Sequence, residues 1–178
     1  MKNITLKELL QSNEYQKYDS VLHFINPKNL FNGKESNIES MPYINVRYCI
    51  KLLSNIEKWE NICELFCLCF EIKNDYFWES KITDYYQARN FILKEFKRIV
   101  ETEQKMLASK FDKDTLKWEL AGIKKLEPFS DYLPLDRIGQ RYGINPMELG
   151  RKPYSEVFYL QCMIKTDNEI LKAFNEIT

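Results

Sequence analysis

Recognisable active-site patterns are missing from this sequence of 178 residues. It contains one histidine, His23, which lies among apolar neighbours and is better explained as a structural side chain than as a catalytic base. Its five glycines form neither a Gly-x-Gly-x-x-Gly pattern nor a Walker loop, which are the two common phosphate cradles. We therefore predict no catalytic residues, no cofactor and no small-molecule substrate.

The sequence also lacks an excess of either charge and a long apolar run. Its 26 basic and 26 acidic residues give a formal net charge of zero, whereas nucleic-acid binders usually carry a basic excess that neutralises phosphates. No stretch reaches the roughly 20 apolar residues that a membrane span needs, and Glu8 interrupts the segment where a secretory signal would be apolar. We expect neither nucleic acid nor a membrane as a partner.

The cysteines lack the spacing of a metal site or a disulfide framework. Their number is odd, and they stand at Cys49, Cys63, Cys67, Cys69 and Cys162. Cys63 and Cys67 would share a helical face, but a structural zinc site needs two further ligands, which usually come from a second close pair. We predict no metal site and expect reduced thiols buried in the core of a protein from a reducing compartment.

Apolar residues at helical spacing recur along most of the chain. Thr5 and Glu8 form a capping box ahead of a first helix. Pro42 and Pro153 stand at the favoured first position of two others, and residues 59–72 fit a further, buried helix. The pattern predicts an all-α fold.

These helices are expected to form one domain, a single-domain irregular helical bundle over residues 1–178. N-terminal helices and a loop occupy residues 1–40, and the loop is the stretch 26–40, rich in Asn, Lys and Ser. A bundle core occupies residues 41–127, and a helical corner with a long C-terminal helix occupies residues 128–178.

One long central helix, at about residues 79–110, is expected to organise the bundle. The segment contains neither Gly nor Pro, and two adjacent stripes of apolar residues repeat in it every seven positions: Tyr85, Ile92, Ile99 and Met106, beside Tyr86, Leu93, Val100 and Leu107. Together they would make an apolar face wider than a coiled-coil seam. The sequence therefore predicts packing by several other helices.

Arg89 and Glu103 share a third register beside those two stripes. Charged side chains at the edge of a core need partners. Ion pairs within the chain and contacts across a subunit interface both satisfy that need, and both interpretations stay open. We take Arg89 and Glu103 as candidate assembly contacts.

Two later helices are expected to turn apolar side chains inward. Residues 115–126 carry Leu116, Leu120, Ile123 and Leu126, and the helix opened by Pro153 carries Val157, Leu160, Ile164, Leu171 and Phe174. Pro42 and Pro153 each begin the pattern Pro-Tyr-x-x-Val-x-Tyr. The chemistry of a helix start explains the match, and an internal duplication is the alternative.

Residues 136–149 resemble the first helix and turn of a helix-turn-helix, with Gly139 as the small helical residue and Gly143 in the turn. The reading helix of that motif needs two to three turns in the major groove. Here Gly150 ends the second helix after about one turn, so a packing corner is the favoured interpretation. Under the alternative, a DNA-binding regulator, the contacting residues would be Arg137, Gln140 and Arg141.

Four segments carry a resemblance to a known class of proteins: residues 117–123, 135–138, 142–146 and 153–158. Together they make the C-terminal third of the chain similar to small helical proteins of tailed bacteriophages, either head–tail connector or ring components or tail-assembly chaperones. The resemblance implies a non-enzymatic virion structural or assembly protein, found in the virion or the host cytoplasm. Its partners would be other phage structural proteins or copies of itself in an oligomer. A cytosolic helical interaction module of another kind, or a small enzyme with no readable signature, is the remaining alternative.

Overall fold

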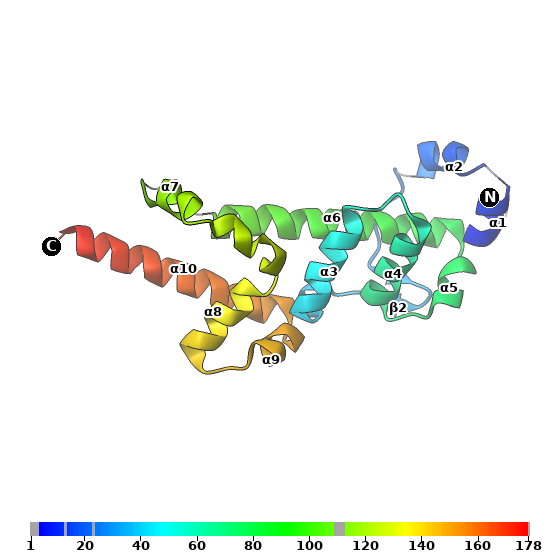
Figure 1. The fold of residues 1–178 in the computed structure, drawn as a ribbon. Coiled ribbons are helices and arrows are strands. Elements are labelled where there is room, and N and C mark those ends of the chain that lie inside the picture. The colour runs from blue at the N-terminus through cyan, green and yellow to red at the C-terminus, as the bar shows by residue number, and fades with distance from the viewer. Residues whose placement is uncertain (1–3, 13, 23, 109–112, 178) are drawn as a thin grey trace. The chain divides into compact units, whose positions relative to one another are not determined.

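The structure, a computed structural model, describes residues 4–12, 14–22, 24–108 and 113–177. In these ranges the fold is all-α, as predicted, with a single short hairpin added to the helices (Figure 1). The chain divides into two compact units, which are described separately here: the first contains residues 1–41 and 48–99, the second residues 42–47 and 100–178. The prediction of one domain stays a prediction.

The first unit is built from elements close in sequence. They are α1 (Leu6–Gln11), α2 (Tyr15–Leu22), β1 (Leu30–Phe31), β2 (Lys34–Glu35), η1 (Ile38–Ser40), most of α3 (Tyr43–Leu53), α4 (Trp59–Phe70), α5 (Asn74–Trp78) and the first part of α6 (Ile82–Leu107). The predicted capping box is confirmed at α1. The Thr5 amide donates to a Glu8 carboxylate oxygen at 2.8 Å, and the Glu8 amide donates to the Thr5 hydroxyl at 3.2 Å.

A β-hairpin lies where residues 26–40 were expected to form a loop. Leu30 pairs with Glu35 and Phe31 with Lys34 in an antiparallel register. Asn32 and Gly33, between the strands, have φ angles of 48° and 76°, and two positive φ values in a row are typical of the type I′ turn that closes two-residue hairpins. The turn brings Phe31 into the core, where it is buried.

Aromatic rings form the centre of the first unit. Phe66 of α4 lies with its ring centroid 4.9 Å from Phe31, 5.2 Å from Phe77 and 5.3 Å from Tyr85. Phe70 adds a further ring 5.8 Å from Phe66. All five side chains are buried, and edge-to-face and tilted contacts of this kind add to the large apolar area that each ring removes from water.

The central helix α6 is shorter than predicted and buries a narrower face. It spans Ile82–Leu107. Its start is later than predicted because Glu79 caps the end of the preceding helix, α5. Residues 109 and 110, at the predicted end, lie outside the described residues. Its buried apolar side chains at three- and four-residue spacing are Ile82, Tyr85, Ala88, Ile92, Phe96 and Ile99. Of the second stripe only Tyr86 is buried, since Leu93 is 37% exposed, and in the first stripe Met106 is 47% exposed. The prediction of two full stripes was therefore wrong. The buried face of α6 therefore combines residues of the first stripe, such as Ile92, with residues that share the register of Arg89 and Glu103, such as Phe96.

The second unit contains the start of α3, the end of α6 and the later helices. These are α7 (Lys113–Leu120), η2 (Ile123–Phe129), α8 (Leu133–Tyr142), α9 (Pro146–Arg151) and α10 (Tyr154–Ile177). No helix among the described residues is long and apolar enough to cross a membrane.

Two predictions of inward-facing side chains fail in this unit. The helix expected over 115–126 breaks at Gly122, whose φ is +88°, and Leu116, Leu120, Ile123 and Leu126 are exposed. In α10, Val157 is buried and Leu160 and Ile164 are half-buried, but Leu171 and Phe174 are 53% and 65% exposed. Periodicity identified an apolar face on each helix, but it could not show how much of that face other parts of the chain cover.

The two Pro-Tyr segments noticed in the sequence lie beside each other. Pro42 and Pro153 form an isolated antiparallel bridge, and the Tyr43 amide donates to the Lys152 carbonyl at 2.9 Å. The rings of Tyr43 and Tyr154 stack 6.1 Å apart with an interplanar angle of 5°. The starts of α3 and α10 are thereby joined, and the valine three residues after each tyrosine, Val46 and Val157, is fully buried.

Candidate protein-interaction surface

A half-buried charge cluster replaces apolar packing at the centre of the second unit. The Arg47 guanidinium donates from Nη1 to both carboxylate oxygens of Glu103, at 3.0 and 2.8 Å, and from Nε to Asp131 at 3.3 Å. The Tyr154 hydroxyl donates to Glu103 at 3.0 Å. The three charged side chains are between 10% and 23% exposed. We call Arg47, Glu103, Asp131 and Tyr154 the clasp, since it ties α3, α6, α10 and the turn before α8 together.

The electrostatics of the clasp follow from its burial. Burial has the largest single influence on the pKa of Arg47 and acts to lower it, but Glu103, Tyr43 and Asp131 together outweigh burial and raise that pKa, so the guanidinium stays charged. Burial, together with the Glu103 charge, raises the pKa of Tyr154, and burial raises the pKa of Tyr43. Both phenols therefore stay protonated at neutral pH. The Tyr154 hydroxyl donates to a Glu103 carboxylate that Arg47 already binds, so this contact helps to hold Glu103 in place.

Glu103 and Arg89, the two candidate assembly contacts, each have a partner within the chain. Glu103 belongs to the clasp. Arg89, in the first unit, lies 3.3 Å from Asp19 and places its guanidinium 5.8 Å from the centroid of the Tyr86 ring. These contacts fit the interpretation of ion pairs within the chain, and a role for either residue in assembly stays a prediction.

The helix-turn-helix-like corner has the geometry that its glycines predicted. A Cβ on Gly139 would lie 2.6 Å from the carbonyl oxygen of Ile144, so the chain can turn only over a glycine there. Gly143 ends α8 with a φ of 68°. Asn145 then caps α9 by accepting from the Met147 amide at 2.8 Å. The second helix has six residues, too few to read a major groove.

Two of the three side chains named as DNA contacts are held by acids of the chain. Gln140 donates to Asp136 at 2.7 Å, and Arg141 pairs with Asp167 at 2.5 Å. Arg137 is exposed and has no hydrogen-bond or ion-pair partner among the described residues. The arrangement therefore favours the packing corner over the DNA-binding alternative.

The cysteines lie mostly in the core. Cys49, Cys63 and Cys69 are buried, as expected, while Cys67 and Cys162 are only half-buried, and none forms a disulfide. Burial raises the pKa of Cys63 to about 12, so its thiol is unreactive at neutral pH. The described residues hold no cluster of three or more side chains suited to a metal. His23 lies outside the described residues.

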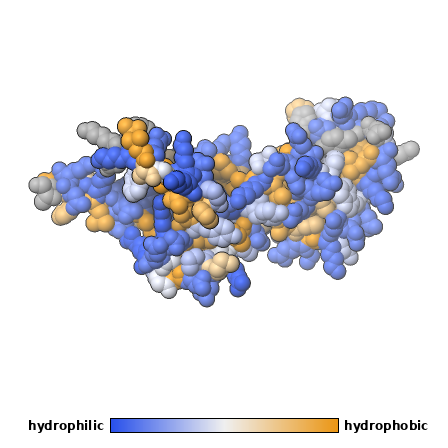
Figure 2. Space-filling view, in the orientation of Figure 1, coloured by the Kyte–Doolittle hydropathy of each residue, from blue (hydrophilic) through white to orange (hydrophobic). Residues whose placement is uncertain are grey.

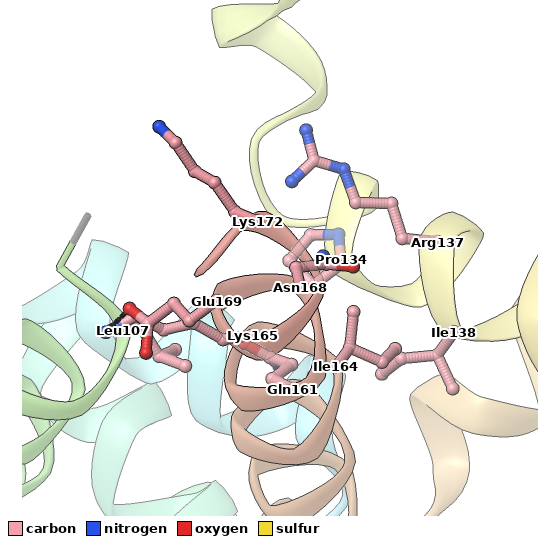
Figure 3. A pocket seen from close by; sticks show the side chains of 10 residues that line it. All are labelled: Leu107, Pro134, Arg137, Ile138, Gln161, Ile164, Lys165, Asn168, Glu169 and Lys172. Atoms are coloured by element: carbon pink, nitrogen blue, oxygen red, sulfur yellow. Dashed lines mark ion pairs between the residues drawn. The ribbon is translucent and has the colours of Figure 1, made fainter. Parts of the chain in front are cut away.

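A groove runs along the outer side of the second unit. Its volume is about 430 Å³, and its apolar walls come from Leu107, Pro134 and Ile164 with Ile138 beneath them. Figure 3 shows the Ile138 and Ile164 side chains facing each other, with the cationic ends of Arg137 and Lys172 directed toward the top of the view. The other lining residues are Gln161, Lys165, Asn168 and Glu169.

Large apolar side chains also reach the surface of the second unit. On α7 and η2 they include Leu116, Trp118, Leu120 and Phe129; on α10 they include Ile170, Leu171, Phe174 and Ile177, and all eight are more than half exposed. Figure 2 shows orange, hydrophobic surface over α7 and along α10. Exposed apolar surface on this scale is typical of protein–protein or membrane interaction sites and of ligand-binding grooves.

Comparison of the chain with protein-family models, with curated proteins and with solved structures finds no match. The function proposed below therefore depends on this surface and on the resemblance stated for the C-terminal third.

Proposed function

We propose that this chain is a non-enzymatic structural or assembly protein of a tailed bacteriophage and that it works through protein–protein contacts made by its second unit. The resemblance of the C-terminal third to phage head–tail and tail-assembly proteins supports the phage assignment. One observation carries the mode of action: the second unit exposes 16 large apolar side chains and buries only seven apolar residues among those described. A partner that covers this surface would stabilise the unit by removing it from water.

Two kinds of partner fit the proposal: other virion proteins and further copies of this chain. The formal net charge of zero leaves no overall repulsion between copies. A head-to-tail contact, in which one face of a copy meets a different face of the next copy, would close into a ring if its rotation permits.

The test combines particle proteomics with light scattering of the full chain. Proteins of purified phage particles and of the assembly intermediates would be identified by mass spectrometry, and the purified chain would be expected as an oligomer or in a stable complex with a virion protein. Trp118→Ser with Leu120→Ser, on α7, should weaken that assembly. Val21→Ser with Tyr76→Ser is the matched control, because both side chains are exposed on the first unit, at 63% and 58%. A monomer with no partner in particles or intermediates would refute the proposal.

A further inference from the structure

The turn of the β-hairpin contains Asn32-Gly33, and Asn32 is the only asparagine of the sequence that is followed by glycine. Asparagine is among the thermally labile residues of proteins, because the backbone nitrogen of the next residue can attack the carbonyl carbon of its side chain. The side chain of that next residue normally hinders the attack. Glycine has no side chain, so Asn32 is the asparagine that is easiest to attack.

The structure leaves this dipeptide open to water. Asn32 and Gly33 are both exposed. Among the described residues, no atom beyond the chain neighbours of Gly33 lies within 4 Å of the position that a Cβ on this glycine would take. Asn37 lies in the same segment and is exposed as well, but the residue after it is Ile38, whose branched side chain is buried. Asn37 is therefore the matched comparison for Asn32.

The side-chain amide of Asn32 joins the hairpin to α5. Its Nδ2 donates to the carbonyl oxygen of Tyr76 at 2.7 Å. On the hairpin the residue before Asn32 is Phe31, and on α5 the residue after Tyr76 is Phe77. Both phenylalanines are buried, with their ring centroids 6.3 Å apart. The hydrogen bond therefore connects two backbone segments at the edge of the aromatic core, and Nδ2 is the atom that deamidation removes.

We propose that Asn32 is a site of deamidation and that its conversion releases the hairpin from α5. In the first step the Gly33 nitrogen forms a bond to Cγ of Asn32 and the Cγ–Nδ2 bond breaks. Nδ2 leaves as ammonia, with the proton that the Gly33 nitrogen gives up. Water then opens the five-membered succinimide at either of its carbonyl groups, which yields aspartate or isoaspartate. The conversion consumes one water, releases one ammonia and needs neither an oxidant nor a reductant.

The products cannot keep the contact with α5. A carboxylate accepts hydrogen bonds but has none to donate, so its oxygens repel the Tyr76 carbonyl oxygen. Isoaspartate also adds a methylene to the main chain of the turn, where both residues have positive φ. The two-residue turn that fixes the pairing of Leu30 with Glu35 is then lost. Conversion therefore loosens the hairpin around the buried Phe31.

The first experiment ages the purified full chain in mildly alkaline buffer and follows its peptides by mass spectrometry. The peptide with Asn32 should gain the mass difference between NH₂ and OH and should separate into an aspartate and an isoaspartate form. The peptide with Asn37 should stay unchanged. Each conversion adds one negative charge to a chain whose formal net charge is zero, so the aged chain should also separate from the fresh one by ion exchange.

The second experiment measures what the conversion does to the hairpin. Asn32→Asp reproduces the aspartate product, and Asn37→Asp adds the same charge to the same segment. The Ser36 amide donates to the Asn29 carbonyl at 2.8 Å. In hydrogen exchange this amide should be about fivefold less protected in Asn32→Asp than in Asn37→Asp, because one hydrogen bond of ordinary strength is lost.

Three results would overturn the proposal. Conversion of Asn32 in the urea-unfolded chain but not in the folded chain would show that the folded turn is closed to the reaction. Conversion of Asn37 at the same rate would show that the glycine is not what directs it. Equal protection of Ser36 in the two aspartate variants would show that the bond to Tyr76 does not hold the hairpin. None of these measurements depends on the proposed assembly function.

Discussion

The two units of this chain use apolar residues in opposite ways. Among the described residues, the first unit has 22 buried apolar residues and six large exposed ones, whereas the second has seven and 16. The first surrounds Phe66 with rings. The second holds together through the clasp around Arg47 and through the pairing of Tyr43 with Tyr154.

The difference shows how a helical protein can leave apolar faces uncovered without losing its structure. Burial of apolar surface is non-directional and covers whatever is available. Directed contacts, such as the Arg47 guanidinium on Glu103, fix the position of a few helices and leave their other faces uncovered. The second unit is therefore held by a few polar contacts in addition to its seven buried apolar residues, and its other apolar faces stay uncovered.

The largest expected effect is the loss of a ring from the first unit. Phe66→Ala should lower the free energy of unfolding by about 3–5 kcal/mol, because it leaves a cavity among four aromatic rings. Phe129→Ala removes the same atoms from a side chain of the second unit that is 57% exposed and should cost no more than about 0.5 kcal/mol. Urea unfolding of both variants measures the difference. Equal losses would break the comparison between the units.

The next effect concerns the clasp. Arg47→Met should lower the free energy of unfolding by about 2–4 kcal/mol, because Glu103 and Asp131 would be left half-buried without their cation. Arg89→Met is the matched control: Arg89 is equally exposed at 23%, but it meets a single carboxylate that is 37% exposed, so about 1 kcal/mol or less is expected. Thermal unfolding of the Arg47→Met and Arg89→Met variants tests this difference in stability. A larger loss of stability in Arg89→Met would contradict it.

The smallest effect separates two buried glycines of the second unit. Gly139→Ala should cost about 1–3 kcal/mol, because the new Cβ would lie 2.6 Å from the Ile144 carbonyl oxygen. Gly150→Ala should be neutral or stabilise by up to about 1 kcal/mol, because its Cβ would meet Leu135 at 3.6 Å, an ordinary contact, within α9. Chemical unfolding of the two variants measures this difference in the free energy of unfolding. If Gly139→Ala were neutral, the corner would not depend on close packing.

Local chemistry in the sequence predicted the parts of the fold that depend on neighbouring residues. Thr5 and Glu8 cap α1 as their spacing indicated, and α9 is as short as predicted, although it ends at Arg151 and not at Gly150. The hairpin at Asn32-Gly33 could have been predicted in the same way, since Asn-Gly is the strongest short signal for a type I′ turn. Its strands of two residues each were too short to show an alternating pattern.

Contacts between distant parts of the chain could not be predicted. Arg47 lies 56 residues from Glu103 and 84 from Asp131, and no periodic pattern connects them. The stripe of α10 was found correctly as a face of the helix. Whether Leu171 and Phe174 are covered depends on which other segments pack against them. The spacing of residues within one helix carries no information about those segments. The groove escaped prediction for the same reason, although Arg137 had been singled out for another role.

The bridge between Pro42 and Pro153 has a consequence for the order in which the chain acquires its structure. Residues 48–99, which belong to the first unit, separate the two parts of the second unit. On a chain synthesised from its N-terminus, the first unit is complete before Pro153 exists. Ordering residues 48–99 first shortens the flexible loop that must close when Tyr43 meets Tyr154, and the entropy lost on closure grows with loop length. The second unit, with its exposed apolar side chains, is then the last part to form.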